Sequence, residues 1–256
     1  MAEYTLITGA SSGIGECFAR ALAARKHNLV LVARSQAKLE ALAGELRAAF
    51  EIQAEPVALD LSLPGAAAQL VQLMSERKLE IDLLINNAGF GTPGEFWRVS
   101  LEREAEMVRL NVQALMEMTH LLLPPMIARR QGAIINVSST ASFQPMPYSA
   151  VYAATKAFVT AFSLGLGEEL RPYGVRMVTL CPGMTATNFF AAGGYGTRQA
   201  PGGLQAPEEV VLAALKALDH GGGLVIPRLL NKVGVFLQRF VPRTLVLKVT
   251  ARMFRR

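Results

Sequence analysis

The sequence predicts an α/β fold: a doubly wound, mainly parallel sheet of about seven strands, in a single domain with a C-terminal helical extension. The chain has 256 residues, 51% of them hydrophobic, which is enough to bury one large core. Short apolar runs rich in β-branched residues alternate with longer segments of 3.6-residue periodicity. The strand candidates are 5–8, 29–33, 56–60, 83–86, 133–137, 176–180 and 224–227.

The first four strands each run into residues suited to ligand binding. TLIT (5–8) precedes Gly9, LVLVA (29–33) precedes Arg34, PVALD (56–60) ends at Asp60, and LLIN (83–86) precedes Asn87. The segment 36–49 between the second and third strands has helical periodicity. Open parallel sheets bind ligands beyond the carboxyl ends of their strands, so these residues are expected to share one site.

The second half continues the alternation. A long helical pattern over 102–128 leads to AIINV (133–137), and a second one from Tyr152 leads to RMVTL (176–180). LVIP (224–227) is the last strand candidate. The residues after the fifth and sixth strands, Ser139 and Pro182, are expected at the same edge of the sheet.

Composition indicates a reduced, intracellular protein. The two cysteines, Cys17 and Cys181, lie far apart in apolar surroundings, unlike a disulfide framework. The chain enters an apolar strand at Tyr4 with no signal-peptide pattern before it. The expected location is cytoplasmic, with peripheral membrane contact as a further possibility. The three histidines stand alone, so no metal site is expected.

The positive charge is concentrated at the C-terminus. Residues 228–256 hold eight Lys/Arg and no Asp or Glu. Of the 26 Lys/Arg, 18 are therefore left against 20 Asp/Glu in 1–227, a net charge of −2. This distribution argues against a nucleic-acid partner. The expected organisation is a domain over 1–227 and a basic extension over 228–256.

A glycine-rich loop follows the first strand. In TGASSGIG (8–15), Gly9, Gly13 and Gly15 would allow a tight turn, close approach to a pyrophosphate and close packing of the next helix. The helix N-terminus would then present free N–H groups to the phosphates. An ordinary turn could contain the same glycines, but the place between strand and helix favours dinucleotide binding.

The spacing Thr-Gly-x-x-x-Gly-x-Gly resembles the short-chain dehydrogenase/reductase (SDR) family, which has a Rossmann-type fold. The resemblance continues through NNAG (86–89), Asn111, Ser139, Tyr152-x-x-x-Lys156 and Pro182-Gly183, and covers residues 5–187. It implies catalytic roles for Asn111, Ser139, Tyr152 and Lys156. The cofactor-binding residues that it and the strand-end chemistry imply are Gly9, Ser11, Ser12, Gly13, Ile14, Gly15, Arg34, Asp60, Leu61, Asn87, Ala88, Gly89, Tyr152, Lys156, Pro182, Gly183, Thr185 and Thr187.

Arg34 indicates that NADP(H) is preferred over NAD(H). NAD-binding sheets carry a carboxylate at the end of the second strand, where this sequence has Ala33 followed by Arg34. A guanidinium can bind a 2′-phosphate through paired hydrogen bonds, whereas a carboxylate repels it. The alternative is that Arg34 is a solvated surface charge. Asp60 resembles the aspartate with which the family contacts adenine.

Tyr148, Tyr152 and Lys156 would form one stripe if all three were helical, so two tyrosines compete as the proton donor. A lysine one turn from a tyrosine favours the phenolate and lowers a phenol pKa that is ordinarily near 10. Tyr152 is one turn from Lys156 and follows Ser139 by 13 residues, the separation expected of the family. In the family's mechanism Tyr152 would protonate the alkoxide, Ser139 would hold the carbonyl oxygen, Lys156 would bind the nicotinamide ribose, and Asn111 would hold a water. Tyr148 stays unassigned, as a pocket or helix-cap residue.

Two C-terminal segments bear on the substrate. Residues 188–207 resemble the family's flap over the substrate, and Phe189, Phe190 and Tyr195 in it suggest an apolar substrate. A surface loop without substrate contact is the alternative. The extension 228–256, interrupted by Pro242, looks like two short amphipathic helices. It could be a membrane-surface anchor, an oligomer or substrate-cap element, or, against its hydrophobicity, a solvated tail.

The resemblance and the residues together predict an NADP(H)-dependent oxidoreductase that interconverts a carbonyl and a secondary alcohol on a small, hydrophobic substrate. The family pairs through helices corresponding to 102–128 and 152–171, so a homodimer or homotetramer is expected. One alternative is a catalytically idle dinucleotide-binding protein, and another is a membrane-surface protein whose main role lies in 228–256.

Overall fold

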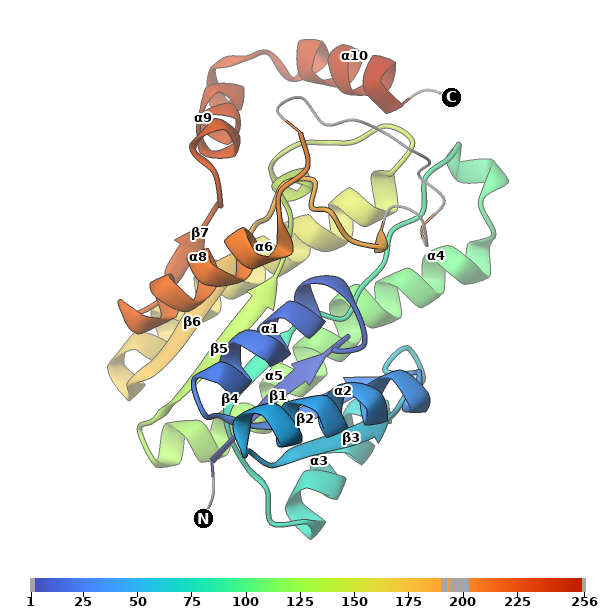
Figure 1. The fold of residues 1–256 in the computed structure, drawn as a ribbon. Helices are drawn as coiled ribbons and strands as arrows, with labels where there is room; N and C mark the ends of the chain where they lie inside the picture. Colours follow the sequence, from blue (N-terminus) through green and yellow to red (C-terminus); the bar gives the residue numbers. More distant parts are fainter. Residues whose placement is uncertain (1–2, 190–192, 194–202, 255–256) are drawn as a thin grey trace.

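All seven predicted strands form one parallel sheet, in the order β3-β2-β1-β4-β5-β6-β7. The structure is a computed structural model and describes residues 3–189, 193 and 203–254 (Figure 1). The strands are β1 (Glu3–Thr8), β2 (Asn28–Ala33), β3 (Ala54–Ala58), β4 (Glu80–Asn86), β5 (Gly132–Val137), β6 (Val175–Leu180) and β7 (Gly223–Val225). The order reverses between β1 and β4, which opens a crevice for a ligand at the strand ends.

Helices cover both faces of the sheet, as the doubly wound prediction requires. They are α1 (Gly13–Ala24), α2 (Gln36–Phe50), α3 (Ala66–Glu76), α4 (Leu101–Val108), α5 (Leu115–Ala128), α6 (Ala150–Leu170), α8 (Pro207–Asp219), α9 (Leu229–Leu237) and α10 (Arg243–Phe254). One buried cluster joins α1, α2 and α8 to the sheet. A second joins α3, α5 and α6 to the other face. The predicted Rossmann-type fold is confirmed.

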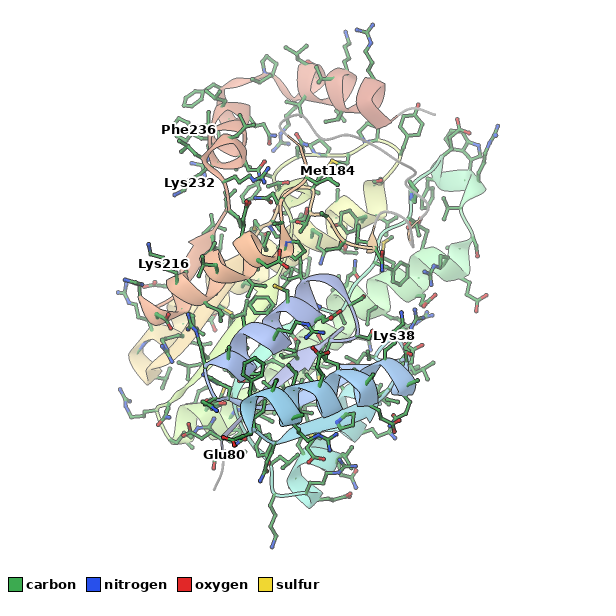
Figure 2. All side chains as sticks on the ribbon, in the orientation of Figure 1. Lys38, Glu80, Met184, Lys216, Lys232 and Phe236 are labelled. Carbon is green, nitrogen blue, oxygen red and sulfur yellow. The ribbon has the colours of Figure 1, made fainter. Side chains whose placement is uncertain are left out.

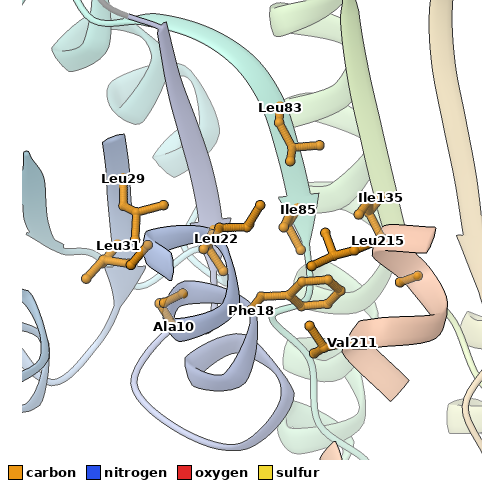
Figure 3. Close-up of a cluster of buried hydrophobic side chains, with 14 of the residues drawn as sticks. Ala10, Phe18, Leu22, Leu29, Leu31, Leu83, Ile85, Ile135, Val211 and Leu215 are labelled. Carbon is orange, nitrogen blue, oxygen red and sulfur yellow. The ribbon is translucent and has the colours of Figure 1, made fainter. Parts of the chain in front are cut away.

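The core against α1 and α8 fixes the helix that follows the glycine-rich loop. Phe18 is fully buried and lies beside Val211 and Leu215 of α8 and Ile85 of β4 (Figure 3). Burying a side chain of this size contributes about 1.5–3 kcal/mol. The N-terminus of α1 is therefore held firmly at the carboxyl edge of the sheet.

Two predicted elements differ in detail. The third strand ends at Ala58, so Asp60 lies in the loop beyond it, where its Oδ1 accepts hydrogen bonds from the N–H and hydroxyl of Ser62 at 2.9 and 2.7 Å. The predicted helix 102–128 is interrupted by the π-helical segment Arg109–Ala114. Such wide turns occur often at functional sites, and this one contains Asn111.

The helix α6 meets the length and hydropathy of a membrane span over Ala150–Tyr173, the one stretch of the described residues to do so. In this structure it packs against β5 and β6, with Val159, Ser163 and Leu170 buried. Its apolar composition therefore serves the core of the domain.

Two helices form the C-terminal extension, as the position of Pro242 predicted. They lie at the end of the molecule opposite the N-terminus, beyond the loops that follow the strands (Figure 1). The extension therefore stands beside the edge at which parallel sheets bind ligands.

Candidate active site

A cavity of about 790 Å³ opens at the carboxyl ends of the strands. It is lined by most of the residues selected from the sequence, which the fold gathers from the loops after six strands and from the helices that follow them. They are Gly9, Ser11, Ser12, Gly13, Ile14, Arg34, Asp60, Leu61, Asn87, Ala88, Gly89, Ser139, Tyr152, Lys156, Pro182, Gly183, Thr185 and Thr187. Gly15 and Asn111 do not line the cavity and act behind its wall.

The loop after β1 packs closely against the start of α1, because Gly15 has no side chain there. A Cβ atom at Gly15 would lie 2.2 Å from the carbonyl oxygen of Gly9, a separation that no side chain tolerates. The side chain of Ser12 makes no capping hydrogen bond, so the first N–H groups of α1 are not satisfied by it. This donor set suits the diphosphate of a dinucleotide.

The loops after β1 and β4 are tied together beneath the cavity. The hydroxyl of Thr8 accepts hydrogen bonds from the backbone N–H groups of Asn87 and Ala88 at 2.9 and 3.0 Å. The side-chain amide of Asn87 donates to the carbonyl of Thr8 at 2.9 Å. These bonds make the floor of the cavity a rigid platform that does not depend on a ligand.

Opposite charges meet where the second and third strands end. The guanidinium of Arg34 is 67% exposed and lies 4.0 Å from the Asp60 carboxylate and 3.7 Å from that of Glu106. Burial would raise the pKa of Asp60, but hydrogen bonds from Ser62 and the charges of Arg34 and Arg103 hold it below its usual value. Arg34 is thus loosely paired and accessible from the cavity.

Lys156 is the most deeply buried charge in the site. Only 4% of its surface is exposed, and its Nζ donates a 2.8 Å hydrogen bond to the carbonyl of Val137. Burial lowers the pKa of this amine to about 8, despite a small opposing influence of Cys181. An amine with such a pKa is still mostly protonated at neutral pH.

Tyr152 and Ser139 share the cavity with Lys156 and differ from Tyr148 in position. The ring of Tyr152 lies 5.6 Å from that of Phe189, at an angle of 52°. The Oγ of Ser139 accepts a 3.1 Å hydrogen bond from the N–H of Ala141, so its own hydrogen can still be donated. Tyr148 precedes α6 with a φ of +63°, and its carbonyl accepts a hydrogen bond from Gly94. It lies before α6 and off the cavity wall, so it does not share the helix face of Tyr152 and Lys156.

Asn111 holds the wall of the site from behind. Its side chain is buried, donates to the carbonyl of Phe90 at 2.9 Å and to the hydroxyl of Thr155 at 3.1 Å, and accepts from the Phe90 N–H at 3.1 Å. Thr155 in turn donates to the carbonyl of Tyr152 at 2.7 Å. The π-helical turn thus connects the β4 loop with the helix that carries Tyr152.

The loop after β6 depends on a residue that sequence reasoning missed. Gln205 is buried, and its Oε1 accepts a 2.8 Å hydrogen bond from the N–H of Gly183. The backbone N–H of Gln205 donates a second hydrogen bond, to the carbonyl of Met184, also at 2.8 Å. Nothing in the sequence around Gln205 indicated this contact, because it joins the two ends of a long loop.

Several further cavity residues had no signal in the sequence. Arg103 packs its guanidinium 3.8 Å above the ring of Phe90, and both line the cavity, as does Thr250 of the C-terminal helix α10. Of the predicted flap 188–207, Phe189 lines the cavity, while Phe190 and Tyr195 lie outside the described residues. Among the described residues, no group of three His, Cys, Asp or Glu could hold a metal ion.

A doubly wound sheet, a glycine-rich loop at its carboxyl edge and a buried lysine one helical turn from a tyrosine are features of a dinucleotide-binding site. The sequence profile of the short chain dehydrogenase family matches residues 3–194, and the chain belongs to this family. This finding confirms the resemblance drawn from the motifs.

Relatives within the family act on carbonyl or alcohol substrates. The chain is 35% identical over 191 residues to the very-long-chain 3-oxoacyl-CoA reductase of Macaca fascicularis, a match covering 73% of this chain and 61% of that protein. Its sequence thus corresponds to less than two thirds of that relative's length.

Two solved structures resemble this fold over nearly the whole chain. A short-chain dehydrogenase from Sphingobium yanoikuyae in complex with NADPH is 33% identical, with a TM-score of 0.83 over 94% of this chain and 96% of that one. The bulky-bulky ketone specific alcohol dehydrogenase from Comamonas testosteroni is 30% identical, with a TM-score of 0.79 over 95% of this chain and 96% of that one.

Proposed function

We propose that this protein is an NADP(H)-dependent oxidoreductase that interconverts a carbonyl and a secondary alcohol on a hydrophobic substrate. Residues 1–227 would form the catalytic domain and 228–256 an extension. The observation that carries this proposal is that Ser139, Tyr152 and Lys156 line one cavity with the glycine-rich loop. Proton transfer and dinucleotide binding can therefore take place side by side.

Each side chain has a role that its surroundings suit. When bound, the dinucleotide supplies hydride to a carbonyl carbon or accepts it from the carbon of an alcohol. Tyr152 gives its proton to the carbonyl oxygen during reduction and takes it back during oxidation. Ser139 donates a hydrogen bond to that oxygen and aligns it with the phenol.

Lys156 has two tasks in this proposal. Its ammonium favours the phenolate form of Tyr152, and its N–H groups that do not bond to Val137 would hold the hydroxyls of the nicotinamide ribose. Asn111 lies outside the cavity and positions the catalytic side chains through its hydrogen bonds to Phe90 and Thr155. It would also hold the water that links Lys156 to solvent.

The preference for NADP(H) rests on the charges at the adenosine end. Arg34 and Lys38 both line the cavity and are both exposed, and Lys38 is labelled in Figure 2. A 2′-phosphate would displace the long contacts of Arg34 with Asp60 and Glu106 in favour of a paired, charge-assisted interaction. The NADPH complex of the Sphingobium relative supports the same choice.

The substrate is proposed to be a bulky ketone or a 3-oxoacyl thioester. Ala141, Met146, Met184 and Phe189 line the cavity around Tyr152 and supply an apolar surface. The names of two relatives, a very-long-chain 3-oxoacyl-CoA reductase and a bulky ketone alcohol dehydrogenase, fit this surface.

A homodimer or homotetramer is part of the proposal. Large apolar side chains are exposed along the helices α4–α6, where the family pairs. They are Leu101, Val108, Met116, Phe158 and Leu164. If light scattering finds only monomer, the proposed oligomer is wrong, and the proposed reaction is not affected.

The test is NADPH oxidation with 3-oxoacyl thioesters of increasing chain length and with bulky ketones. Tyr152→Phe should lower kcat by about 100-fold or more, because the proton donor is lost. Tyr148→Phe is the matched control and should stay within about threefold, since Tyr148 lies off the cavity wall. Tight NADPH binding without turnover of any substrate would indicate a catalytically idle binding protein instead.

A further inference from the structure

The C-terminal extension is attached to the body by an inner face. Asn231 of α9 lies so close to the loop after β6 that a Cβ at Gly183 would be 2.5 Å from its side-chain nitrogen. Val235 is buried one turn later, and Thr250 of α10 is buried and lines the cavity. Arg228, where the extension begins, lies 3.0 Å from Glu209 and donates to the carbonyl of Leu204. The two helices thus form a roof over the loop after β6 and one wall of the cavity.

The outer face of the same roof is apolar and uncovered. Ten large apolar side chains there are between 36% and 75% exposed: Leu229, Leu230, Val233, Phe236, Leu237, Phe240, Val241, Leu245, Leu247 and Val249. Phe236 and Phe240 pack edge to face, 5.4 Å apart, so the patch is ordered within itself. Large apolar side chains exposed in this number on one short segment mark a site of interaction.

Basic side chains frame this outer face. Lys232, Arg239, Arg243, Lys248 and Arg252 are all exposed, and 228–256 contains no Asp or Glu. Lys232 and Phe236 project from α9 toward the outside of the molecule (Figure 2). Apolar side chains beside cations, with no anion between them, complement an anionic lipid surface.

A second copy of the chain fits this face less well. A twofold contact would bring the same basic residues of both copies together without a carboxylate from either extension to neutralise them. An anionic bilayer provides the acyl chains for Phe236 and its neighbours and the negative headgroups for the lysines and arginines. We therefore propose that the outer face of the extension docks onto the surface of an anionic phospholipid bilayer.

Docking would place the roof of the active-site cavity against the lipid. The exposed apolar residues and the cavity-lining Thr250 belong to the same extension. A hydrophobic substrate could then pass from the acyl chains into the cavity beside the roof. This consequence rests on the proposed function, whereas the docking itself does not.

The experiment is co-sedimentation of the full chain with vesicles of phosphatidylcholine, with and without phosphatidylserine. The apolar variant is Leu230→Gln/Phe236→Gln/Leu237→Gln, and the charge variant is Lys232→Glu/Arg239→Glu. The matched control is Leu212→Gln/Lys216→Glu, which makes the same kinds of change at exposed positions of α8. All changed residues are exposed, so the thermal midpoint should stay that of the parent protein.

The wild type should sediment with the phosphatidylserine vesicles and lose this binding at high salt. The charge variant should bind about 25-fold more weakly or worse, because each lost cation accounts for about fivefold. The apolar variant should lose about tenfold or more, and the control should match the wild type.

Wild-type protein that stays in solution with both vesicle types overturns the proposal, as does a control that loses binding like the other variants. If the apolar variant instead changes the oligomeric state in light scattering, the partner is a second copy and the lipid assignment is wrong. NADPH oxidation with a soluble ketone, measured on the same samples, reports the proposed function separately from sedimentation.

Discussion

The Nζ atom of Lys156 donates a 2.8 Å hydrogen bond to the carbonyl oxygen of Val137, the last residue of β5. The bond brings a charge from α6 into the core at the end of the strand that leads to Ser139. The next residue, Ser138, donates its hydroxyl hydrogen to the carbonyl of Lys156 at 2.9 Å. Strand and helix are therefore joined in both directions, and the amine has little freedom to leave the site.

The stability of the ligand-free protein should depend on the Lys156 amine. Burial lowers its pKa from 10.5 to about 8, so between these values the unfolded chain binds more protons than the folded one. Stability from this group therefore rises with pH across that window, and the cost of burying the charge is fully present below pH 8. The difference in unfolding free energy between Lys156→Met and the wild type, which favours the mutant and is measured in urea, should shrink by on the order of 3 kcal/mol as the pH rises through this window.

Lys216→Met is the control for this measurement, because Lys216 is exposed on α8. Lys216→Met shows the effect of losing an exposed lysine at each pH. A Lys156→Met difference that follows the Lys216→Met difference at every pH would mean that the Lys156 amine keeps its ordinary pKa.

Arg34→Ala should weaken NADPH binding selectively. Loss of a paired, charge-assisted contact with the 2′-phosphate should cost about 1.5–3 kcal/mol, or about 10–100-fold in Kd. NADH lacks that phosphate, so its Kd should change little. Fluorescence titration with both dinucleotides makes the comparison, and Arg47→Ala on the exposed side of α2 is the control. Equal weakening of both, or tighter NADH binding in the wild type, would show that Arg34 is a surface charge.

Asn111→Leu should destabilise the fold as well as the site. The change leaves the N–H and carbonyl of Phe90 and the hydroxyl of Thr155 without the partner they have now. Losing a partner costs a buried polar group about 1–3 kcal/mol, so the three groups together should lower the unfolding free energy by about 3 kcal/mol or more. Gln113→Leu, on an exposed position of the same π-helical segment, should change it by less than about 0.5 kcal/mol.

A separate measurement tells whether Asn111 positions the reacting groups. Asn111→Asp keeps the acceptor for the Phe90 N–H but replaces the amide donor to Phe90 and Thr155 with a second carboxylate oxygen, so it should lower kcat and shift the pH profile while NADPH binding persists. If kcat falls only in proportion to the folded fraction, the role of Asn111 is purely structural.

Thr250→Trp should narrow the cavity from its roof. Thr250 is buried and lines the cavity, while Val249 beside it points outward and is 51% exposed. For bulky ketones, kcat/KM should fall by about 10-fold or more in Thr250→Trp. Val249→Trp should leave it within about twofold. NADPH affinity should be unchanged in both, and an unaffected Thr250→Trp enzyme would place the substrate elsewhere in the cavity.

The sequence by itself determined the layers of the fold and the candidate chemistry. Alternating strand and helix patterns lead to a doubly wound parallel sheet because each apolar face can be buried only between layers. In such a sheet the strand ends converge, so Gly9, Asn87, Ser139 and Pro182 meet although they lie far apart along the chain. Local spacing was also sufficient to prefer Tyr152 over Tyr148.

Only the tertiary structure decided what local patterns do not encode. The positive φ of Tyr148 arises where its loop meets Gly94, the clamp of Gln205 on Gly183 closes a long loop, and Thr250 reaches the cavity from the far end of the chain. The tertiary structure also decided which face of each C-terminal helix is buried and which is exposed. Periodicity marks an amphipathic helix, but which residues are buried depends on the surface that the helix meets, and that surface exists only once the sheet and its loops have folded.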